Sequence, residues 1–506
     1  MAAQKNDIKT YKMYINGEWV NSSSDKTINV MDPSKGTVMA RVQEGSPENI
    51  KSAIDAAKDS FEKGIWSRLT PSDRSRILLK IADIIESKSD ELSRLESMNS
   101  GKSIKQASNY DLPYTVDNIR FLAGASRILE GKAMSEYVED GTSAIRREPI
   151  GVVGVITPWN YPLMMVVWRA FPALAMGNTV IVKPASYTPL TTLRLAEIAE
   201  TAGIPRGVFN VVTGPGDITG EALAKSEDVG MIAFTGSTEV GRRLTQLGSS
   251  NLKKISLELG GKAPFIVFDD ADIEAAVEGA IVGGLVNNGE DCANSTRYYV
   301  HVKVLPKFRD LLTRKLKTVR VGDPLQQDTD MGPMVSETHR KRVEGYIEAG
   351  VGEGGTILFG GERISVKDHE NGYYLSPTAI YTENDRSKIV MEEIFGPVFT
   401  VLPFNEYDEV IQRSNSVVYG LGASVWTKDV TRALRATRDL RFGTVWVNEH
   451  VPVPSEMPWA GYKQSGHGAS LSAYSLEEYT YIKHVYFDLT GKRRKSWYYQ
   501  IYGDKQ

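Results

Sequence analysis

The chain has almost no cysteine: Cys292 is the only one in 506 residues, which excludes an internal disulfide. A single cysteine is most often a small buried hydrophobic residue. Its surroundings favour another interpretation, because residues 287–291 read Asn-Asn-Gly-Glu-Asp, which is not typical of an interior strand. A thiol on such a polar, glycine-hinged segment is a candidate nucleophile.

A candidate base lies upstream of this thiol. Residues 257–262 read Leu-Glu-Leu-Gly-Gly-Lys, and a strand-like apolar run follows at 263–268. This order predicts that Glu258 lies at the mouth of a loop. A thiol together with a carboxylate indicates a nucleophile and a base.

The chain also lacks an excess of either charge and an uninterrupted apolar run. Its 60 basic and 63 acidic residues give a net charge of -3, so neither nucleic acid nor a membrane is an expected partner. The longest uncharged run, 149–168, is broken by Pro158, Asn160 and Pro162, and we interpret it as a buried strand and turn. The first ten residues lack the apolar core of a secretory signal, so a cytoplasmic location is expected.

The N-terminal quarter predicts a hairpin followed by helices. Residues 13–20 read as an edge hairpin that turns at Asn16-Gly17. Helices are predicted from Ser46-Pro47 and Thr70-Pro71, where a capping side chain precedes a proline, and a third over 111–129. Residues 142–147 are a candidate strand for a contact between subunits.

Residues 151–249 alternate β-rich runs with helical stretches, which predicts a parallel, doubly wound sheet. Such a sheet binds a dinucleotide at the carboxyl ends of its strands. There Gly236 and Ser237 open a helix whose N–H groups suit a phosphate, and Lys183 ends a strand. The alternatives are a simple helix cap and a solvated lysine, and the Gly-x-Gly-x-x-Gly fingerprint is absent.

A second alternating region spans 263–446. Its most unusual loop, Glu-Glu-Ile-Phe-Gly-Pro at 392–397, is either a ligand-facing turn or a plain surface turn. A glycine-punctuated loop at 457–468 carries Trp459, and a strand is predicted at 479–487. The last dozen residues, rich in Lys, Arg and Tyr, form a short tail.

Five motifs identify a family when they are taken together. In chain order they are Pro-Trp-Asn-Tyr-Pro (158–162), Phe-Thr-Gly-Ser-Thr (234–238), Leu-Glu-Leu-Gly-Gly-Lys (257–262), Gly-Glu-Asp-Cys (289–292) and Glu-Glu-Ile-Phe-Gly-Pro (392–397). The chain resembles the aldehyde dehydrogenase superfamily. Three segments look most like its γ-aminobutyraldehyde and betaine-aldehyde branch: Gly-x-Asp-Cys (289–292), Pro-Trp-Asn-Tyr-Pro-Leu-Met-Met (158–165) and Ser-Glu-Met-Pro (455–458).

The resemblance implies an α/β fold with a Rossmann-like cofactor lobe, an α/β catalytic lobe and a small β oligomerisation arm. The implied boundaries are 1–128 and 149–258 for the dinucleotide-binding domain, 259–463 for the catalytic domain, 129–148 and 476–490 for the arm, and 491–506 for the tail. It also implies a homo-oligomer, either a dimer or a tetramer.

The resemblance further implies NAD(P)-dependent oxidation of an aldehyde to the carboxylic acid, with no metal site. Cys292 would form the thiohemiacetal and thioester, Glu258 would be the base, and Asn160 would be an oxyanion donor. Glu393 and Phe395 correspond to residues beside the nicotinamide half of the cofactor. The other implied cofactor residues are Ile156, Trp159, Lys183, Ser186, Gly216, Gly236 and Ser237.

Two departures from the family pattern bear on specificity. Ser186 stands where NAD-preferring relatives usually have a glutamate that would repel a 2′-phosphate, so the sequence leans towards NADP over NAD. Asp291, directly before the thiol, opposes thiolate formation, which favours a compensating role in holding a cationic substrate. Its alternative role is to cap a turn.

Tyr161, Trp168 and Trp459 match positions that line an aromatic tunnel in aminoaldehyde and betaine-aldehyde enzymes. We therefore expect an ω-aminoaldehyde such as 4-aminobutyraldehyde. The alternatives are a broad-specificity enzyme for glyceraldehyde, succinic semialdehyde or aliphatic aldehydes, an acylating relative that uses coenzyme A, and a catalytically silent relative. The intact Cys292 and Asn160 argue against silence, and Glu258 argues against the acylating branch.

Overall fold

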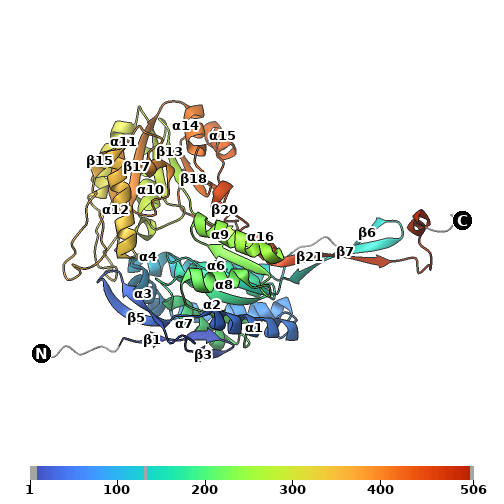
Figure 1. Cartoon of the computed structure of the whole chain (residues 1–506). Coiled ribbons are helices and arrows are strands. Elements are labelled where there is room, and N and C mark those ends of the chain that lie inside the picture. Colours follow the sequence, from blue (N-terminus) through green and yellow to red (C-terminus); the bar gives the residue numbers. More distant parts are fainter. Residues whose placement is uncertain (1–7, 130–133, 502–506) are drawn as a thin grey trace.

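Two large lobes and a long arm make up the part of the chain that the computed structural model describes, residues 8–129 and 134–501 (Figure 1). The strands of these residues form four sheets. Three segments lie outside the described residues. They are residues 1–7, in the stretch where a secretory signal was sought, residues 130–133 of the expected arm and residues 502–506 of the expected tail.

The first lobe is built on an eight-stranded sheet with the order β20-β12-β11-β8-β9-β10-β2-β3. Its parallel strands are β8 (Val152–Ile156), β9 (Thr179–Lys183), β10 (Phe209–Val211), β11 (Met231–Thr235) and β12 (Lys254–Glu258). Antiparallel strands complete both edges: β20 (Gly466–His467), β2 (Met13–Ile15) and β3 (Glu18–Val20). The predicted alternation and the edge hairpin at Asn16-Gly17 are confirmed.

Helices cover this sheet on both faces, and a small sheet flanks it. The helices are α1 (Pro47–Lys63), α2 (Pro71–Ser87), α3 (Ser89–Ser100), α4 (Ile104–Gln106), α5 (Leu112–Ala125), α6 (Pro162–Ala175), α7 (Leu190–Ala202), α8 (Glu221–Lys225) and α9 (Thr238–Gly248). The small sheet contains β1 (Thr10–Tyr11), β4 (Thr27–Asp32) and β5 (Thr37–Gln43). Both predicted caps are present, because the hydroxyls of Ser46 and Thr70 accept hydrogen bonds from backbone N–H groups of α1 and α2.

We interpreted the uncharged run 149–168 as a buried strand followed by a turn. The structure confirms the strand, but the interpretation of the second half as a turn is wrong. The strand β8 is present, but helix α6 begins at Pro162, where proline suits the first helical turn. Every residue of α6 is buried, so the helix has no polar stripe that would give a helical period in the sequence.

The second lobe holds a seven-stranded sheet with the order β15-β16-β17-β14-β13-β18-β19. Its strands are β13 (Ala263–Val267), β14 (Ser295–His301), β15 (Thr356–Phe359), β16 (Thr378–Tyr381), β17 (Val398–Phe404), β18 (Gly422–Trp426) and β19 (Thr444–Val447). Its helices are α10 (Ile273–Leu285), α11 (Leu305–Leu316), α12 (Glu337–Gly352), α13 (Lys388–Met391), α14 (Tyr407–Asn415) and α15 (Val430–Asp439).

The arm extends far from both lobes (Figure 1). It consists of β6 (Ser135–Val138), β7 (Gly141–Pro149) and β21 (Thr480–Asp488), with β7 in the centre. Strands β7 and β21 pair antiparallel along their whole length, from Pro149 opposite Thr480 to Gly141 opposite Asp488. Helix α16 (Ser472–Glu478) leads into β21. The predicted strands at 142–147 and 479–487 are confirmed.

Candidate active site

Cys292 lies in a turn between a short helical segment, η4 (Val286–Gly289), and strand β14. Three consecutive residues before it, Asn287, Asn288 and Gly289, have left-handed backbones with φ of 51°, 60° and 75°. Asparagine and glycine tolerate this region best, which explains why the segment has this sequence. The left-handed run reverses the chain so that Cys292 faces the space between the lobes.

The side chains of this segment are polar, but two of them are buried rather than exposed to solvent. Asn287 and Asn288 are buried, and their side chains satisfy backbone groups of other segments. The Asn288 amide donates to the carbonyls of Gly101 (3.1 Å) and Pro333 (2.9 Å). Polar side chains therefore hold this turn from inside the protein. We call residues 287–293 the nucleophile turn, after the role predicted for Cys292.

The electrostatic surroundings keep the Cys292 thiol protonated at rest. Burial raises its pKa well above the usual value, and the carboxyl groups of Asp291, Glu258 and Glu393 raise it further. A thiolate at this position needs a compensating change when a ligand binds.

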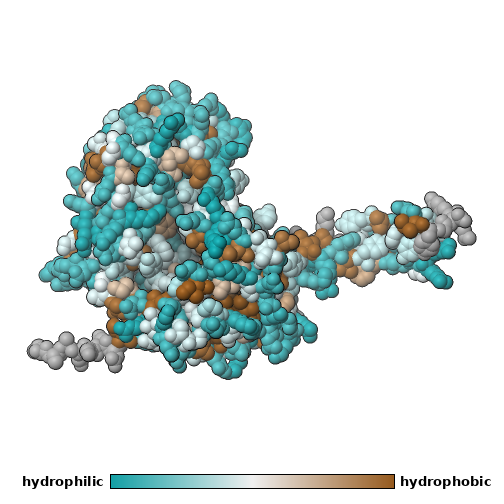
Figure 2. Space-filling view, in the orientation of Figure 1, coloured by the Kyte–Doolittle hydropathy of each residue, from teal (hydrophilic) through white to brown (hydrophobic). Residues whose placement is uncertain are grey.

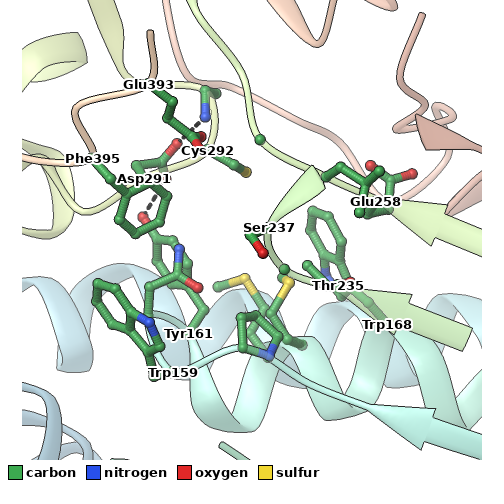
Figure 3. Close-up of a pocket in the computed structure, with 18 of the residues that line it drawn as sticks. Trp159, Tyr161, Trp168, Thr235, Ser237, Glu258, Asp291, Cys292, Glu393 and Phe395 are labelled. Atoms are coloured by element: carbon green, nitrogen blue, oxygen red, sulfur yellow. Dashed lines mark hydrogen bonds between the residues drawn. The ribbon is translucent and has the colours of Figure 1, made fainter. Parts of the chain in front are cut away.

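Glu258 ends strand β12 and lines the same cavity as Cys292 (Figure 3). Neither of its buried carboxyl oxygens has a hydrogen-bond partner within the described residues. Burial raises the pKa of Glu258 to about 8; the nearby Arg169 opposes this shift and Glu478 adds to it. An unpaired buried carboxyl with a pKa near neutrality is suited to exchange protons with a ligand or a water molecule.

Asn160 lies between β8 and α6 and lines the same cavity. Its side-chain amide nitrogen donates to the backbone carbonyl of Glu290 (3.0 Å), and the backbone carbonyl of Asn160 accepts from the Asn287 side chain (2.9 Å). These bonds fix Asn160 against the nucleophile turn. The second hydrogen of the amide nitrogen is available to a ligand.

The cavity has a volume of about 400 Å³ and takes its walls from both lobes. It brings together most of the residues predicted from the sequence: Trp159, Asn160, Tyr161, Trp168, Gly236, Ser237, Glu258, Asp291, Cys292, Glu393, Phe395 and Trp459. Four predicted residues do not line it: Ile156, Lys183, Ser186 and Gly216.

One end of the cavity is aromatic. Trp168 packs edge-on against Trp459, with ring centroids 6.5 Å apart. The hydroxyl of Tyr161 donates to Asp291 Oδ2 (2.6 Å), and the backbone N–H of Ala293 donates to Asp291 Oδ1 (2.6 Å) (Figure 3). Asp291 therefore both caps the nucleophile turn and contributes to the aromatic wall.

A buried lysine lies behind this wall. The Lys102 ammonium is 4.2 Å from the centroid of the Tyr161 ring and 2.5 Å from Asp111 Oδ2. Burial raises the pKa of Asp291, whereas the hydrogen bonds from Tyr161 and Ala293 and the charge of Lys102 lower it. The net result is a pKa above the usual value, with burial as the largest cause, and Tyr161, Ala293 and Lys102 limit this rise.

Sequence reasoning missed several cavity residues, among them Tyr110, Tyr114, Met164 and Met165. Tyr110 lies in a π-helical turn, η1 (Ala107–Asp111), and stacks on Tyr114, which lies in α5. Their spacing of four residues on a helix was a usable signal, since such residues share a face. The methionines follow the Pro-Trp-Asn-Tyr-Pro motif on the first turn of α6.

The other end of the cavity contains Glu393, Phe395 and the start of α9. Glu393 accepts a hydrogen bond from the Gly261 N–H (2.9 Å), and burial raises its pKa to about 7. Phe395 has a left-handed backbone (φ 60°), and its carbonyl oxygen lies 2.7 Å from His339 Nε2. His339 is another residue that the sequence did not reveal. It fixes a strained loop beside the cavity.

The four predicted residues outside the cavity lie near the carboxyl ends of three neighbouring strands: Ile156 ends β8, Lys183 ends β9 with Ser186 in the loop beyond it, and Gly216 begins η2 after β10. The ammonium of Lys183 is buried and donates to the carbonyl of Pro184 (2.7 Å). Burial lowers its pKa to about 8, while Asp217 acts in the opposite direction. The turn η2 (Gly216–Gly220) packs on Ile156 and Lys183, because a Cβ at Gly220 would lie 3.6 Å and 3.7 Å from their side chains.

These residues fit a dinucleotide. Ser237 caps α9, and Gly236 precedes it without a side chain, so N–H groups at the start of this helix can reach a phosphate. Lys183 offers a cation and Ser186 a hydroxyl, which now donates to the carbonyl of Gly214 (3.1 Å). All lie at the carboxyl ends of parallel strands, where such folds bind nucleotides.

Comparison with known proteins decides the family. A profile described as the aldehyde dehydrogenase family matches residues 19–485, nearly the whole chain. The chain belongs to the aldehyde dehydrogenase family. As a member, it is an NAD(P)-dependent enzyme that oxidises an aldehyde.

Individual relatives agree with this membership. The betaine aldehyde dehydrogenase of Bacillus subtilis (strain 168) is 41% identical, covering 94% of this chain and 96% of the relative. The phenylacetaldehyde dehydrogenase of Pseudomonas fluorescens is 40% identical, covering 93% of this chain and 94% of the relative. The two are named for different aldehydes, so the family alone does not choose the substrate.

The solved structures give the same result. An NAD+ complex of an aldehyde dehydrogenase from Bacillus cereus matches with a TM-score of 0.92 and 40% identity, covering 95% of this chain and 97% of that one.

No helix within the two described ranges is long and apolar enough to span a membrane.

Proposed function

We propose that this aldehyde dehydrogenase oxidises a cationic ω-aminoaldehyde, such as 4-aminobutyraldehyde, to the corresponding amino acid. The observation that carries the proposal is the carboxylate of Asp291, which is held at the aromatic end of the cavity by Tyr161 and Ala293. A carboxylate attracts an ammonium group, and aromatic faces stabilise one by roughly 0.5–2 kcal/mol each. The likeness to a betaine aldehyde dehydrogenase supports this assignment.

In the proposed reaction, the Cys292 thiol releases its proton to solvent, and the sulfur attacks the aldehyde carbon to form the thiohemiacetal anion. The second amide hydrogen of Asn160 and the backbone N–H of Cys292 hold the oxygen that becomes negative. A nicotinamide cofactor, held by the residues described below, would supply the hydride acceptor. Cys292 then carries the substrate as a thioester, and Glu258 removes a proton from the water that hydrolyses it.

The cofactor residues that we propose are those that the family resemblance implies, and the chemistry of their side chains and backbone suits a dinucleotide. Glu393 would accept hydrogen bonds from the nicotinamide ribose, and Phe395 would contact the ring. Six residues would hold the adenosine and phosphates: Ile156, Trp159, Lys183, Gly216, Gly236 and Ser237. Ser186 places a hydroxyl where a carboxylate would exclude a 2′-phosphate, so we propose that NADP is used at least as well as NAD.

The second candidate is a general or aromatic aldehyde. Apart from Asp291, the substrate end of the cavity is lined by aromatic rings and by Met164 and Met165, which suit an uncharged chain or ring. The likeness to a phenylacetaldehyde dehydrogenase supports this candidate.

The deciding experiment compares kcat/KM for 4-aminobutyraldehyde, butyraldehyde, succinic semialdehyde and phenylacetaldehyde in the wild type and in Asp291→Asn. At an effective dielectric constant near 20, one charge pair about 6 Å apart contributes on the order of 2–3 kcal/mol before desolvation. Even half of that is roughly tenfold in kcat/KM. The amine should lead in the wild type and lose its lead in Asp291→Asn. If an uncharged aldehyde leads in the wild type, Asp291 is a turn cap and the second candidate holds.

The arm supports a further proposal, a homo-oligomer. Apolar side chains are exposed along it, including Tyr137 (62%), Ile482 (65%) and Phe487 (47%), and Figure 2 shows hydrophobic patches along its length. An extended apolar surface of this kind marks a protein contact. We propose that the arm joins copies of this chain into a dimer or a tetramer.

A further inference from the structure

The peptide unit that follows Cys292 makes close contacts with Gly261, Asp291 and His450. A Cβ at Gly261 would collide with the carbonyl oxygen of Cys292, so the loop between β12 and β13 lies directly against this turn. The N–H of Ala293 donates to Asp291, and the carbonyl of Ala293 lies 2.9 Å from Nε2 of His450. The last of these contacts comes from a residue with no role so far.

His450 is buried, with 1% of its surface exposed. Its Nδ1 lies 3.1 Å from the hydroxyl oxygen of Ser424, which is buried in the middle of β18. Burial lowers the pKa of His450 to about 4, so the ring is neutral at physiological pH. A carbonyl can only accept; therefore Nε2 carries the proton and donates to Ala293, while Nδ1 accepts from Ser424.

Packing leaves this ring only one orientation. Its centroid is 4.6 Å from that of Trp446 and 6.0 Å from that of Phe265. On another side it lies so close to α10 that a Cβ at Gly283 would be 2.7 Å from the His450 Cδ2 atom. The imidazole is thus a rigid donor aimed at Ala293.

The residues that follow His450 form part of the cavity wall. Val451 and Val453 both line the cavity, and Val451 has a left-handed backbone with φ of 94°. Trp446 also fixes this loop, because its indole N–H donates to the carbonyl of Pro452 (2.8 Å). The substrate wall and the nucleophile turn are therefore connected through one imidazole.

We propose that His450 is a positioning residue for the nucleophile: its Nε2–H bond to Ala293 fixes the turn that presents the Cys292 thiol and backbone N–H to the aldehyde. This inference rests on the proposed role of Cys292 as nucleophile. The carbonyl that His450 holds belongs to Ala293, the residue after Cys292. Loss of this hydrogen bond therefore frees the turn to rotate. Misplacing reacting groups by about 1 Å can lower a rate by about 100-fold.

Two substitutions separate the hydrogen bond from the packing of the ring. In His450→Gln, the side-chain amide nitrogen reaches the position of Nε2 and can still donate to Ala293. In His450→Asn, the shorter amide reaches the position of Nδ1 and Ser424 but not Ala293. Both variants lose the aromatic ring, and His450→Asn also leaves a space about one methylene larger, so the stability of each variant is measured alongside its activity.

The measurements are kcat and KM for the aldehyde, the Kd for NAD(P), and the rate at which iodoacetamide alkylates the only thiol of the chain. We expect His450→Gln to keep kcat within about threefold, and His450→Asn to lower kcat by about 30- to 100-fold with little change in the Kd for the cofactor. Alkylation should change in the same order, and it needs no turnover.

Equal losses in the two variants, or no loss in His450→Asn, would overturn the proposal. Ser424→Ala provides a second test if either variant is unstable, because it keeps the ring but removes the donor to Nδ1. We expect it to lower kcat, and an unchanged kcat would also count against the proposal. Turnover by Cys292→Ala, in contrast, would refute the proposed function itself, whatever the His450 variants do.

Discussion

At the scale of single residues, the most informative group is Glu258, whose buried carboxyl has no hydrogen-bond partner in the part of the chain that the structure describes and a pKa raised to about 8. A base acts in its deprotonated form, so hydrolysis of the thioester should accelerate as the pH rises through about 8 and then level off. Single-turnover measurements of deacylation against pH test this directly. A rate that is flat between pH 6 and 9 would contradict it.

The same residue gives a control for that profile. In Glu258→Gln the volume is kept and the base is lost, so acyl-enzyme should accumulate and NAD(P)H should appear in a burst equal to the number of active sites. The remaining slow deacylation should have no inflection near pH 8. An unchanged steady state would show that another base acts.

Ser186 gives a prediction about the cofactor. Wild-type kcat/KM for NADP should be at least that for NAD, and Ser186→Glu should shift the preference towards NAD, because a carboxylate repels the 2′-phosphate. Ser186→Ala is the control, since it removes the hydroxyl without adding charge. A wild-type preference for NAD of about tenfold, or roughly 1.4 kcal/mol, would refute the assignment.

At the scale of elements, the β12–β13 loop makes a prediction through its close approach to the nucleophile turn. Gly261→Ala would push a Cβ into the carbonyl of Cys292, so turnover should fall by about 100-fold. Gly345→Ala is the matched control: it lies in helix α12 with nothing within 4 Å of the added Cβ, and alanine favours a helix. Equal activity of the two variants would show that the loop can move aside.

The elements also show how much of the fold could be predicted from the sequence. Caps, prolines and alternating runs act locally, and they predicted α1, α2, the hairpin and the parallel strands. The beginning of α6 at Pro162 was missed, because a helix buried on every side has no polar face to mark its period. The motif residues around Cys292 and Glu258 were found because each motif is short and continuous.

The remaining parts of the site depend on contacts between residues far apart in the chain. His450 meets Ala293 across 157 positions, and Tyr161 meets Asp291 across 130. No local pattern distinguishes such a histidine from any other buried one. The burial of Asn287 and Asn288 could not be predicted either, because a polar side chain is buried only where distant groups satisfy its hydrogen bonds.

At the scale of the whole molecule, the arm predicts an assembly that depends on its apolar face. Ile482→Asp should lower the mass measured by light scattering, because it places a charge in the proposed contact. Leu434→Asp is the control, since Leu434 is as exposed (66% against 65%) but lies on helix α15. Equal masses for both variants and the wild type would place the contact elsewhere.

The central claim is that Cys292 carries the substrate. Cys292→Ala tests it most directly, with turnover of the aldehyde and binding of NAD(P) measured on the same preparation. The account predicts that oxidation is abolished while the Kd for the cofactor stays within about twofold, because the proposed cofactor residues do not include the thiol. Appreciable aldehyde oxidation by Cys292→Ala would contradict the account.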